Sequence, residues 1–515
     1  MSTDIAQNNN RIAKNTLVLY IRMVFLLIIS LFTSRVFLNA LGVVDFGINN
    51  AVGGFVSLFV IITGTLNSSV SRFLTFALGK NDEDYLNKVF STSINIMLFF
   101  SFILLVLGET IGLWFLNYKM NIPTDRMTAA NWLFQSSLLV MVLGMLQNPY
   151  TSVITAHEKM NVYAYMSILG AVLKLIIVYA LYLSHGDNLI FYAVLLFLST
   201  LITSVIYWGY CKHKFAECHY SFVYDKPLLK EFTIFTGWNA FGSFVGVITS
   251  HGINLLINLF YGVTVNTARG IAEQVNGAVN QLLGNFTSSI QPPITKSYAS
   301  GNMAYMHTLV YSGAKLCYFV MLLPMIPICI ETSTVLNLWL GQVPDYAVVF
   351  VRCSLIMSII TSISYTILVG GRASGQIKKY NVYTSLLWFM VFPCSYIAFK
   401  LGYGPTSTYY ISIIDYLLMM LLRLYLIKDL ISISFWEYVN KVYIRIIIVT
   451  LPSFLIPSTL VLIIQPSVVR FLAVTFISLM TTFIFVYFWG LTFGEKQMVR
   501  NIIRKSICSI TRMSS

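Results

Sequence analysis

Charged residues are scarce in this chain, and acidic ones are scarcer than basic ones. Asp, Glu, Lys and Arg together make up 10% of its 515 residues, whereas 57% are hydrophobic. A soluble globular domain carries about 25% charged residues, so this composition excludes that class. A protein that crosses a membrane many times has this balance.

Cysteine and histidine are also few, and neither type is clustered. The seven cysteines show no disulfide or metal-ligand spacing, and the six histidines form no ligand group. The longest predicted outer connection, 116–129, contains no histidine and no paired carboxylates. We therefore expect no enzyme activity, no catalytic residue, no metal and no other cofactor.

Long apolar runs are abundant. About fourteen stretches approach the roughly 20 residues that a helix needs to cross a bilayer. They lie near 16–40, 46–70, 89–117, 130–155, 162–184, 188–211, 233–260, 263–287, 308–331, 346–370, 381–400, 405–427, 442–465 and 468–492. The sequence therefore predicts an all-α polytopic membrane protein with about 14 transmembrane helices.

The positive charges fall mostly on one side of this topology. With the N-terminus inside, only four of the 33 Lys and Arg residues lie in outer connections: Lys119, Arg126, Lys400 and Arg470. The positive-inside rule then places both termini in the cytoplasm. The same bias accounts for the net charge of +14, so we expect no nucleic-acid partner.

Matches at a constant offset of 220 residues indicate an internal repeat. Gly42-Val43 aligns with Gly262-Val263, and KMNVY at 159–163 aligns with KYNVY at 379–383. A repeat of six spans enters the membrane twice from the same side, which makes it parallel. We expect an N-lobe at 1–211, a cytoplasmic linker at 212–232, a C-lobe at 233–428, two extra helices at 429–492 and a basic cytoplasmic tail at 493–515.

A predicted helical hairpin at 238–287 is polar along one side of each arm. Its stripe residues, spaced three or four apart, include Asn239, Ser250, Asn254, Arg269, Glu273, Asn276 and Asn280, and Asn49 belongs to a similar face in the second span. In lipid these groups must face protein or water. Helix packing and the wall of a wet cleft both satisfy that requirement. Arg269 and Glu273, four residues apart, could also neutralise each other.

Four segments resemble one family of transporters. They are RIAKNTLVLYIRMVFLLIISLFTSRVFLNALGVVDFGINNAVGG, SSVSRFLTFALGKND, ARGIAEQVNGAVN and GQIKKYNVY. They resemble the Wzx-type flippases of O-antigen and capsule repeat units, which belong to the MOP superfamily together with the MATE transporters. The resemblance implies two six-helix lobes around a V-shaped cavity. It also implies an oligosaccharide on undecaprenyl pyrophosphate as cargo, flipped by alternating access to the outer leaflet of the bacterial inner membrane.

That cargo would need fixed positive charge inside the membrane, because its pyrophosphate crosses a region of low dielectric constant. Arg provides such charge with a planar fork that grips phosphate. The span-embedded cations are Arg22, Arg35, Lys174, Arg269, Lys315, Arg352 and Arg423. We expect Arg22 and Arg269 first, then Arg35, Lys174 and the polar stripe residues, to line the substrate cavity.

The other embedded charges have different expected roles. Lys315, Arg352 and Arg423 are expected to be structural, with Asp415 as a partner. If transport is coupled to an ion, Glu273 and Asp415 are the candidates. Membrane lipids and other polysaccharide-assembly proteins are the further partners that the resemblance implies.

Two other functions compete with the flippase. A MATE-type multidrug or small-molecule antiporter would share the fold, but exporters of cationic drugs need anionic sites, and the embedded charges here are mostly cationic. A membrane enzyme of polysaccharide assembly, such as a polymerase or ligase, would usually mount its catalytic residues on a sizeable extramembrane segment.

Overall fold

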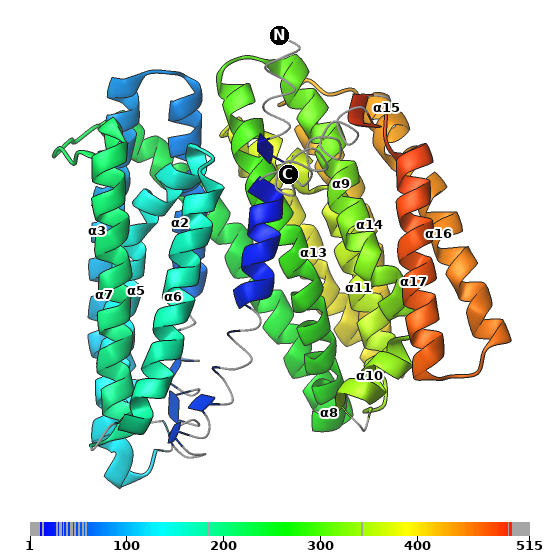
Figure 1. Cartoon of the computed structure of the whole chain (residues 1–515), viewed down its shortest axis with the longest axis horizontal. Coiled ribbons are helices and arrows are strands. Elements are labelled where there is room, and N and C mark those ends of the chain that lie inside the picture. Colours follow the sequence, from blue (N-terminus) through cyan, green and yellow to red (C-terminus); the bar gives the residue numbers. More distant parts are fainter. Residues whose placement is uncertain are drawn as a thin grey trace, which may run out of the picture. The chain divides into compact units, whose positions relative to one another are not determined.

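The computed structural model describes residues 11–12, 15–26, 29, 33, 36–37, 40–41, 45, 48–49, 52–53, 56, 59–118, 120, 122–183, 186–340, 343–492 and 494–496. Over these residues every regular element is a helix (Figure 1). The all-α prediction is therefore confirmed. Arg35, with several other residues of the first predicted span, and the tail beyond 496 lie outside the described residues.

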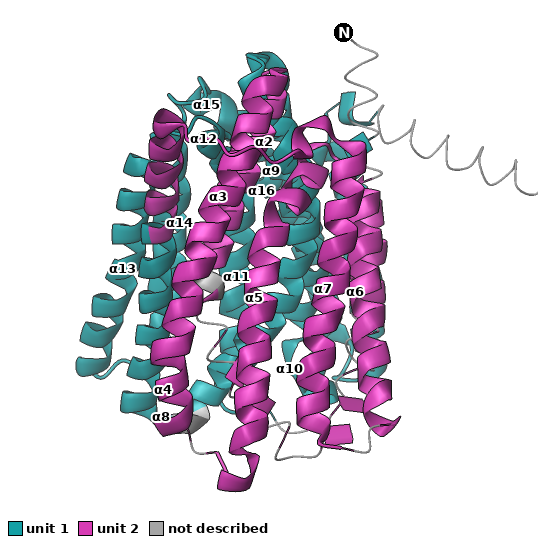
Figure 2. Ribbon diagram, turned by 90° about the vertical axis from the view of Figure 1, so that its left-hand side faces the viewer, with its two compact units in different colours: residues 1–14, 241–515 teal, residues 15–240 magenta. Residues whose placement is uncertain are grey.

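The chain divides into two compact units, coloured separately in Figure 2. One is Asn15–Ala240, here called the 15–240 unit, and the other joins Met1–Lys14 to Phe241–Ser515, here called the 241–515 unit. The division falls inside a helix, between Ala240 and Phe241. The finer plan of two six-helix lobes, a linker and two extra helices stays a prediction.

The 15–240 unit is built from helices, most of them long enough to cross a membrane. They are Asn15–Leu26, α2 (Val60–Gly79), α3 (Glu83–Leu107), α4 (Leu113–Tyr118), α5 (Met127–Ala156), α6 (Met160–Ala180), α7 (Asn188–Lys214) and the start of α8 (Lys226–Ala299). A π-helical turn, Gly108–Gly112, joins α3 to α4. Aspartates begin three of these helices, because a carboxylate accepts hydrogen bonds from the first free backbone N–H groups. Asp82 accepts from Tyr85, Asp187 accepts from Leu189 and Ile190, and Asp225 accepts from Leu228.

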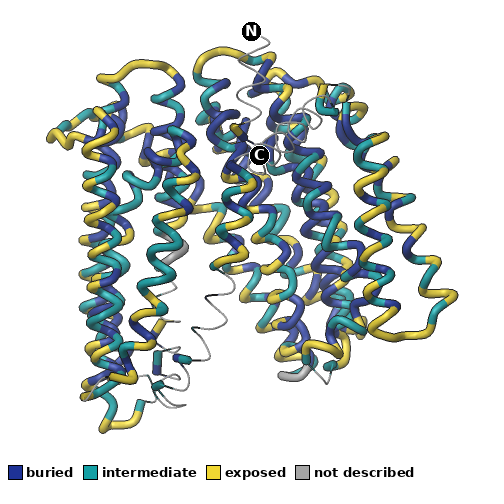
Figure 3. The backbone as a smooth tube through the Cα atoms, viewed as in Figure 1, coloured by how far each residue is buried: buried dark blue, intermediate teal, exposed yellow. Residues whose placement is uncertain are grey.

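The 241–515 unit packs around one central helix. Its elements are the rest of α8, α9 (Met303–Ile330), α10 (Thr332–Leu340), α11 (Ala347–Ile363), α12 (Tyr365–Ala373), α13 (Lys378–Lys400), α14 (Ser407–Ile427), α15 (Phe435–Tyr438), α16 (Ile444–Ile463) and α17 (Val468–Phe485). In α9, 61% of the most apolar window is buried, against 17–39% in the other spans. Figure 3 shows how buried and exposed positions alternate along the helices. The exposed positions include many large apolar side chains, as in helices that face lipid.

Ten helices of the described chain are long and apolar enough to cross a membrane, and α11 with α12 forms an eleventh if the bent pair is one span. They match the predicted spans from 89–117 onward, with one exception. The predicted span at 263–287 is helical but does not belong to this apolar set. Its amide, glycine and charged residues lower its hydropathy.

A single glycine breaks α8 into two arms. Gly262 has φ 80° and ψ −176°, a conformation that residues with a Cβ rarely adopt. No atom lies within 4 Å of the place where a Cβ would stand. The break therefore depends on backbone freedom at this position rather than on close packing.

Hydrogen bonds connect the bend between α11 and α12 to neighbouring helices. The two helices meet at 42° around Ser364. The hydroxyl of Tyr438 donates to the carbonyl of Ile363 (2.9 Å), and the hydroxyl of Thr366 donates to the carbonyl of Val310 (2.9 Å). A buried backbone carbonyl beside a kink needs a hydrogen-bond donor, and Tyr438 provides one for Ile363. The bond from Thr366 joins α12 to α9.

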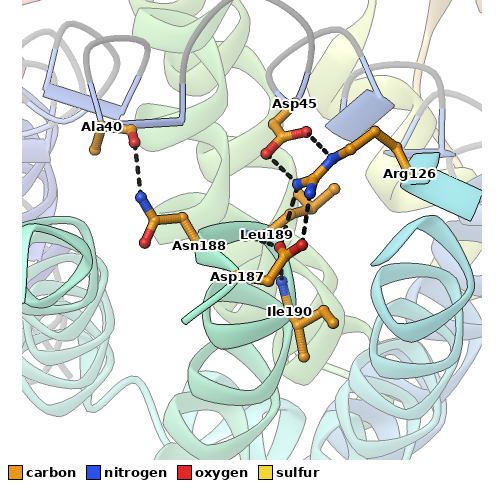
Figure 4. A network of polar contacts seen from close by, with 7 residues as sticks. All are labelled: Ala40, Asp45, Arg126, Asp187, Asn188, Leu189 and Ile190. Atoms are coloured by element: carbon orange, nitrogen blue, oxygen red, sulfur yellow. Dashed lines mark hydrogen bonds and ion pairs between the residues drawn. The ribbon is translucent and has the colours of Figure 1, made fainter. Parts of the chain in front are cut away.

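Three predicted outer connections of the 15–240 unit meet around Arg126 (Figure 4). Its Nε donates to Asp45 (2.8 Å), and its Nη1 donates to Asp187 (2.5 Å). Burial opposes ionisation of Asp187. The hydrogen bonds from Arg126 and from two backbone N–H groups nevertheless hold the pKa of this carboxyl below its usual value. Asn188 donates to the carbonyl of Ala40 (3.1 Å) at the same end.

Predicted cytoplasmic segments meet one another in the same way. Asn15 donates to the carbonyl of Glu158 (3.1 Å), and Asn87 donates to the carbonyl of Glu217 (3.0 Å). The His157 ring lies 2.6 Å from Glu217 through Nε2 and stacks on Phe215 at 4.4 Å between centroids. Burial alone would raise the pKa of the Glu217 carboxyl, but the hydrogen bond from His157 holds it below its usual value. Successive connections thus alternate between two groups, as spans that cross back and forth require.

Candidate functional site

The 15–240 unit contains a cavity of about 710 Å³ that two cations line. Its wall comes from the Asn15–Leu26 helix, from isolated described positions that follow it, and from α5, α6 and α7. The lining residues are Arg22, Leu26, Ile29, Thr33, Phe37, Val140, Ser167, Gly170, Ala171, Lys174, Ile177, Val178, Tyr192 and Leu196. Among these described residues there is no Asp or Glu. We call this space the cationic cavity.

One face of α6 supplies much of that wall. Tyr163, Ser167, Gly170 and Lys174 are spaced by four, three and four residues, so they project from the same side of the helix. Ser167, Gly170 and Lys174 line the cationic cavity. No atom lies within 4 Å of a Cβ placed on Gly170, so this glycine leaves open space in the wall.

Arg22 reaches the cavity without a carboxylate partner among the described residues. Its guanidinium carbon lies 4.8 Å from the centre of the Tyr163 ring, and its buried Nε has no hydrogen-bond acceptor in the described part of the chain. A cation over an aromatic face is only partly compensated for lost hydration. Lys174 is exposed and has no ion pair in the described chain. An anionic ligand would complete the coordination of both groups.

A second, uncharged pocket of about 410 Å³ adjoins the cationic cavity. We call it the polar pocket. Its lining residues are Asn67, Gly144, Gln147, Asn148, Thr151, Tyr163, Met166, Ser167, Gly170, Thr203 and Tyr207. Ser167 and Gly170 belong to both spaces. Cationic and neutral polar surfaces therefore follow one another along α6.

A third hollow, more apolar, opens beside the other two. It measures about 420 Å³ and is lined by Gly53, Val56, Thr63, Asn67, Ser137, Val140, Met141, Gly144, Met145 and Leu196. It shares Asn67 and Gly144 with the polar pocket. The three spaces together hollow the middle of the 15–240 unit between α2, α5, α6 and α7.

The second arm of α8, in the 241–515 unit, carries the predicted pair of Arg269 and Glu273. Arg269 is buried, whereas half of Glu273 is exposed, and the nearest nitrogen and oxygen are 3.6 Å apart. The Arg269 guanidinium lies 5.9 Å from the Tyr409 ring, and its Nε has no hydrogen-bond acceptor among the described residues. The two residues thus interact, but the contact is long for a charge-assisted hydrogen bond.

Asn276 and Asn280 hydrogen-bond to a neighbouring helix. The Asn280 amide donates to Ser358 of α11 (2.9 Å) and to the Asn276 side chain (2.9 Å), and Ser358 donates to Asn276. For these two residues the contacts fit helix packing, one of the two roles that the sequence allows for the polar stripe. The exposed face of this arm is formed by Gly270, Glu273, Gln274, Gly277, Ala278, Gln281, Gly284 and Ser288.

The first arm packs closely on α13. A Cβ added to Gly246 would lie 2.4 Å from the Trp388 ring, and one on Gly252 would lie 2.7 Å from Phe392. Ser250 and Asn254, which share the face of Gly246, are partly buried. Gly246 therefore lets α8 and α13 approach each other, as small residues do between membrane helices.

The remaining predicted site residues are spread through the chain. Asn239 is buried in the 15–240 unit with its Nδ2 unpaired, and Asn49 of the same unit is partly buried. Asp415 is buried in α14, and its Oδ2 has no hydrogen-bond partner in the described chain. The substrate or ion role of each of these residues stays a prediction.

The three cations expected to be structural do have local partners, but not an ion pair with Asp415. Lys315 pairs with Glu495 (2.8 Å). Arg352 donates to the carbonyl of Cys329 (2.9 Å) at the end of α9, and Arg423 donates to the sulfur of Met419 (3.2 Å). The expected partnership with Asp415 was wrong for Lys315 and Arg352, because nearer acceptors satisfy them.

Sequence reasoning selected Arg22 and Lys174 but missed the polar pocket between α2, α5, α6 and α7. The signal was present as helical spacing. Gly144, Gln147 and Thr151 follow one face of α5, and Thr203 and Tyr207 follow one face of α7. Single polar residues in apolar runs draw less attention than charges, so only a combined reading of several spans would have found them.

Comparison with solved structures identifies the fold. A multidrug-resistance MATE family transporter of the MOP superfamily, in an outward-facing conformation, matches with a TM-score of 0.72 and 13% identity over 82% of this chain and 96% of that one. A MATE in the straight conformation gives 0.71 and 14% over the same shares. A MOP superfamily transporter from Pyrococcus furiosus, described by the reverse polarity of its binding pocket, gives 0.69 and 14%, also over 82% and 96%.

No family model and no curated protein matches the chain. The structural matches nonetheless cover nearly the full length of the proteins concerned. The chain is a polytopic membrane protein with the MATE-like fold of MOP superfamily transporters.

Proposed function

We propose that this protein is a MOP superfamily transporter that flips a lipid-linked oligosaccharide from the cytoplasmic to the outer leaflet of a bacterial inner membrane by alternating access. The observation that carries the proposal is the cationic cavity, which Arg22 and Lys174 line with no Asp or Glu among its described residues. The fold, shared with known MOP superfamily transporters, supports the transport part of the proposal.

The charge of the cavity favours an anionic cargo. A pyrophosphate entering this space would meet a guanidinium whose Nε lacks an acceptor, and a lysine without an ion pair, among the residues that the structure describes. Arg can bind two phosphate oxygens at once, and a charge-assisted bond is about twice as strong as a neutral one. The apolar residues of the same wall suit the adjoining lipid chain.

A MATE-type multidrug antiporter is equally compatible with the fold but less so with this cavity. Cationic drugs require an acidic site, and the described lining of the cationic cavity offers none. The Pyrococcus furiosus transporter is described as having a pocket of reverse polarity that suggests a different function. It provides a precedent, within this fold, for judging cargo from pocket charge.

The remaining features of the proposal follow the sequence. Both termini are cytoplasmic by the charge bias. Glu273, half exposed on α8, and Asp415, buried in α14, are the proposed sites of ion coupling. Membrane lipids and polysaccharide-assembly proteins are the proposed partners.

Ligand binding to the purified protein tests the proposal. Polyprenyl pyrophosphate should bind in nanodiscs, and the polyprenol of equal length should bind at least about tenfold more weakly, since it lacks the charge. Arg22→Gln should weaken the pyrophosphate by about 10- to 100-fold, the value of one or two bonds to a charged group. Arg22→Lys should recover part of that loss, because it keeps the charge without the fork.

Lys88→Gln is the matched control, because Lys88 is an exposed cation of the same unit that lines none of the three cavities. It should bind the pyrophosphate as the wild type does. Equal affinity for the polyprenol and the pyrophosphate, or preferential binding of an organic cation displaced by neither lipid, would refute the anionic cargo.

A further inference from the structure

The polar pocket lacks the charges that the adjoining cationic cavity has. None of its described lining residues is Asp, Glu, Lys, Arg or His. Three side-chain amides and five hydroxyls surround its volume of about 410 Å³, which is within the range of small-ligand sites. A neutral ligand with many hydrogen-bonding groups fits this chemistry.

The hydrogen bonds already made within the protein define what the polar pocket offers. Ser167 donates to the carbonyl of Tyr163 (2.8 Å), Thr151 donates to that of Asn148 (2.9 Å), and Thr203 donates to that of Thr200 (2.9 Å). These hydroxyl protons are committed to the helices, so the oxygens remain as acceptors toward the pocket.

One side-chain amide provides a complementary donor, and another provides a further acceptor. Gln147 uses its carbonyl oxygen to accept from Ser204 (2.9 Å), which leaves its NH₂ group for other partners. Asn67 has a buried Oδ1 with no hydrogen-bond donor near it in the described chain. A pocket that offers both acceptors and a donor suits a polyol, whose hydroxyls both donate and accept.

The position of the polar pocket links this neutral ligand to an anion. Tyr163 lines the pocket, and its ring carries the Arg22 guanidinium at 4.8 Å. Ser167 and Gly170 lie on both the polar pocket and the cationic cavity. The two spaces therefore meet at Ser167 and Gly170, less than one turn of α6 apart, so a neutral group and an anion joined directly to each other fit on either side of this boundary.

We propose that the polar pocket is the subsite for the first, uncharged sugar of a glycosyl pyrophosphate whose phosphates occupy the cationic cavity. This inference rests on the proposed function and names the part of the cargo that gives it specificity. A site built to hydrogen-bond hydroxyl groups discriminates strongly against ligands that lack them, because its buried polar groups are then left unpaired.

Two conservative substitutions test the subsite. Asn67→Leu removes an amide whose buried Oδ1 has no hydrogen-bond partner in the described protein, and Tyr207→Phe removes only a hydroxyl. Tyr192→Phe is the control, since Tyr192 lines the cationic cavity and not the polar pocket. The probes are polyprenyl pyrophosphate alone and the same lipid carrying one neutral hexose or N-acetylhexosamine.

The wild type should bind the glycosylated lipid more tightly than the bare one. Asn67→Leu and Tyr207→Phe should each reduce that ratio by about three- to tenfold, the value of one hydrogen bond, and leave the affinity for the bare lipid unchanged. Tyr192→Phe should not change the ratio, and Arg22→Gln should weaken both lipids.

An unchanged ratio in both pocket variants would overturn the subsite while leaving the proposed function standing, because the wild type would still bind the bare pyrophosphate. Equal weakening of both lipids by Asn67→Leu would also overturn it, since the residue would not distinguish the sugar. If the wild type bound neither lipid, the proposed function would fail and the subsite with it.

Discussion

Buried and half-buried cations are compensated in two different ways in this protein. Arg470 forms an ion pair with Glu331, with Nε 2.6 Å from Oε1, and Lys315 lies 2.8 Å from Glu495. Arg22, by contrast, has the Tyr163 ring against its guanidinium and no carboxylate among the described residues. Removing one partner of a buried pair leaves an uncompensated charge and destabilises the fold, whereas Arg22 has no carboxylate to strand among the described residues. Its loss should therefore affect ligand binding more than stability.

These residues also show how far the sequence could be interpreted at this scale. A charge inside an apolar run is conspicuous, so Arg22, Lys174 and Lys315 could all be selected from the sequence. The partners of paired cations could not be selected in the same way. Glu495 is 180 residues from Lys315, and Glu331 is 139 residues from Arg470. Such pairs depend on how the helices pack, which local spacing does not determine.

Asp187 provides a test of the cluster around Arg126. Asp187→Asn should lower the free energy of unfolding by about 1.5–3 kcal/mol at neutral pH, because a hydrogen bond between charged groups is lost while the amide oxygen can still begin α7. The folded-state pKa of Asp187 is below its usual 3.8. Its contribution is thus complete above about pH 4 and is lost as the pH falls through the folded pKa.

The measurement is the unfolding midpoint of wild type and variant from pH 7 to pH 3. The difference between them should shrink below about pH 4. Asp125→Asn is the control, since Asp125 is a nearby exposed acid, and it should change the midpoint little. A difference that stays constant down to pH 3 would show that the charge of Asp187 does not stabilise the fold.

The helices themselves were the most predictable feature. The prediction was less accurate where a helix is polar. Apolar runs gave the spans from 89–117 onward because length and hydropathy are properties of the local sequence. The second arm of α8 was predicted as a span and is a helix, but it is too polar for the apolar set. The 42° bend at Ser364 has no Pro to announce it, so it was missed.

The glycines of α8 allow a matched test of the helix break. Gly262→Ala should destabilise the protein by about 1–3 kcal/mol, because φ 80° is strained for any residue with a Cβ. Gly277→Ala, in the helical part of the second arm, should be neutral or stabilising by up to about 1 kcal/mol. Neither Cβ would meet an atom within 4 Å, so backbone conformation alone separates the two.

Thermal unfolding of both variants in the same detergent makes the comparison. Equal midpoints for Gly262→Ala and Gly277→Ala would mean that α8 does not break at Gly262. A loss of binding or transport in Gly277→Ala without loss of stability would instead assign a functional contact to the exposed face of the second arm.

At the scale of the whole molecule, the fold follows from composition, but sidedness depends on charge. The structure groups alternate connections, since Arg126 gathers Asp45 and Asp187 while His157 meets Glu217. This grouping does not say which group faces the cytoplasm. The positive-inside rule supplies that choice, and the likeness to MATE structures at 13–14% identity concerns the fold alone.

Reporter fusions test the orientation. Fusions after Lys80, Lys230 and Lys379 should report a cytoplasmic location, and fusions near Pro123 and Pro344 should report an external one, because most Lys and Arg residues lie in the first group of connections. An external Lys230 would reverse the topology and with it the proposed direction of transport.

The leaflet in which the lipid-linked oligosaccharide accumulates tests the central claim most directly. Cells lacking the protein are complemented with wild type, Arg22→Gln or Lys88→Gln, and the glycan is probed with a membrane-impermeant glycosidase. Without the protein, and with Arg22→Gln, the glycolipid should accumulate in the cytoplasmic leaflet, protected from the enzyme. Wild type and Lys88→Gln should relieve that accumulation. Accumulation in the outer leaflet, as expected for a missing polymerase or ligase, or no accumulation at all, would contradict the account.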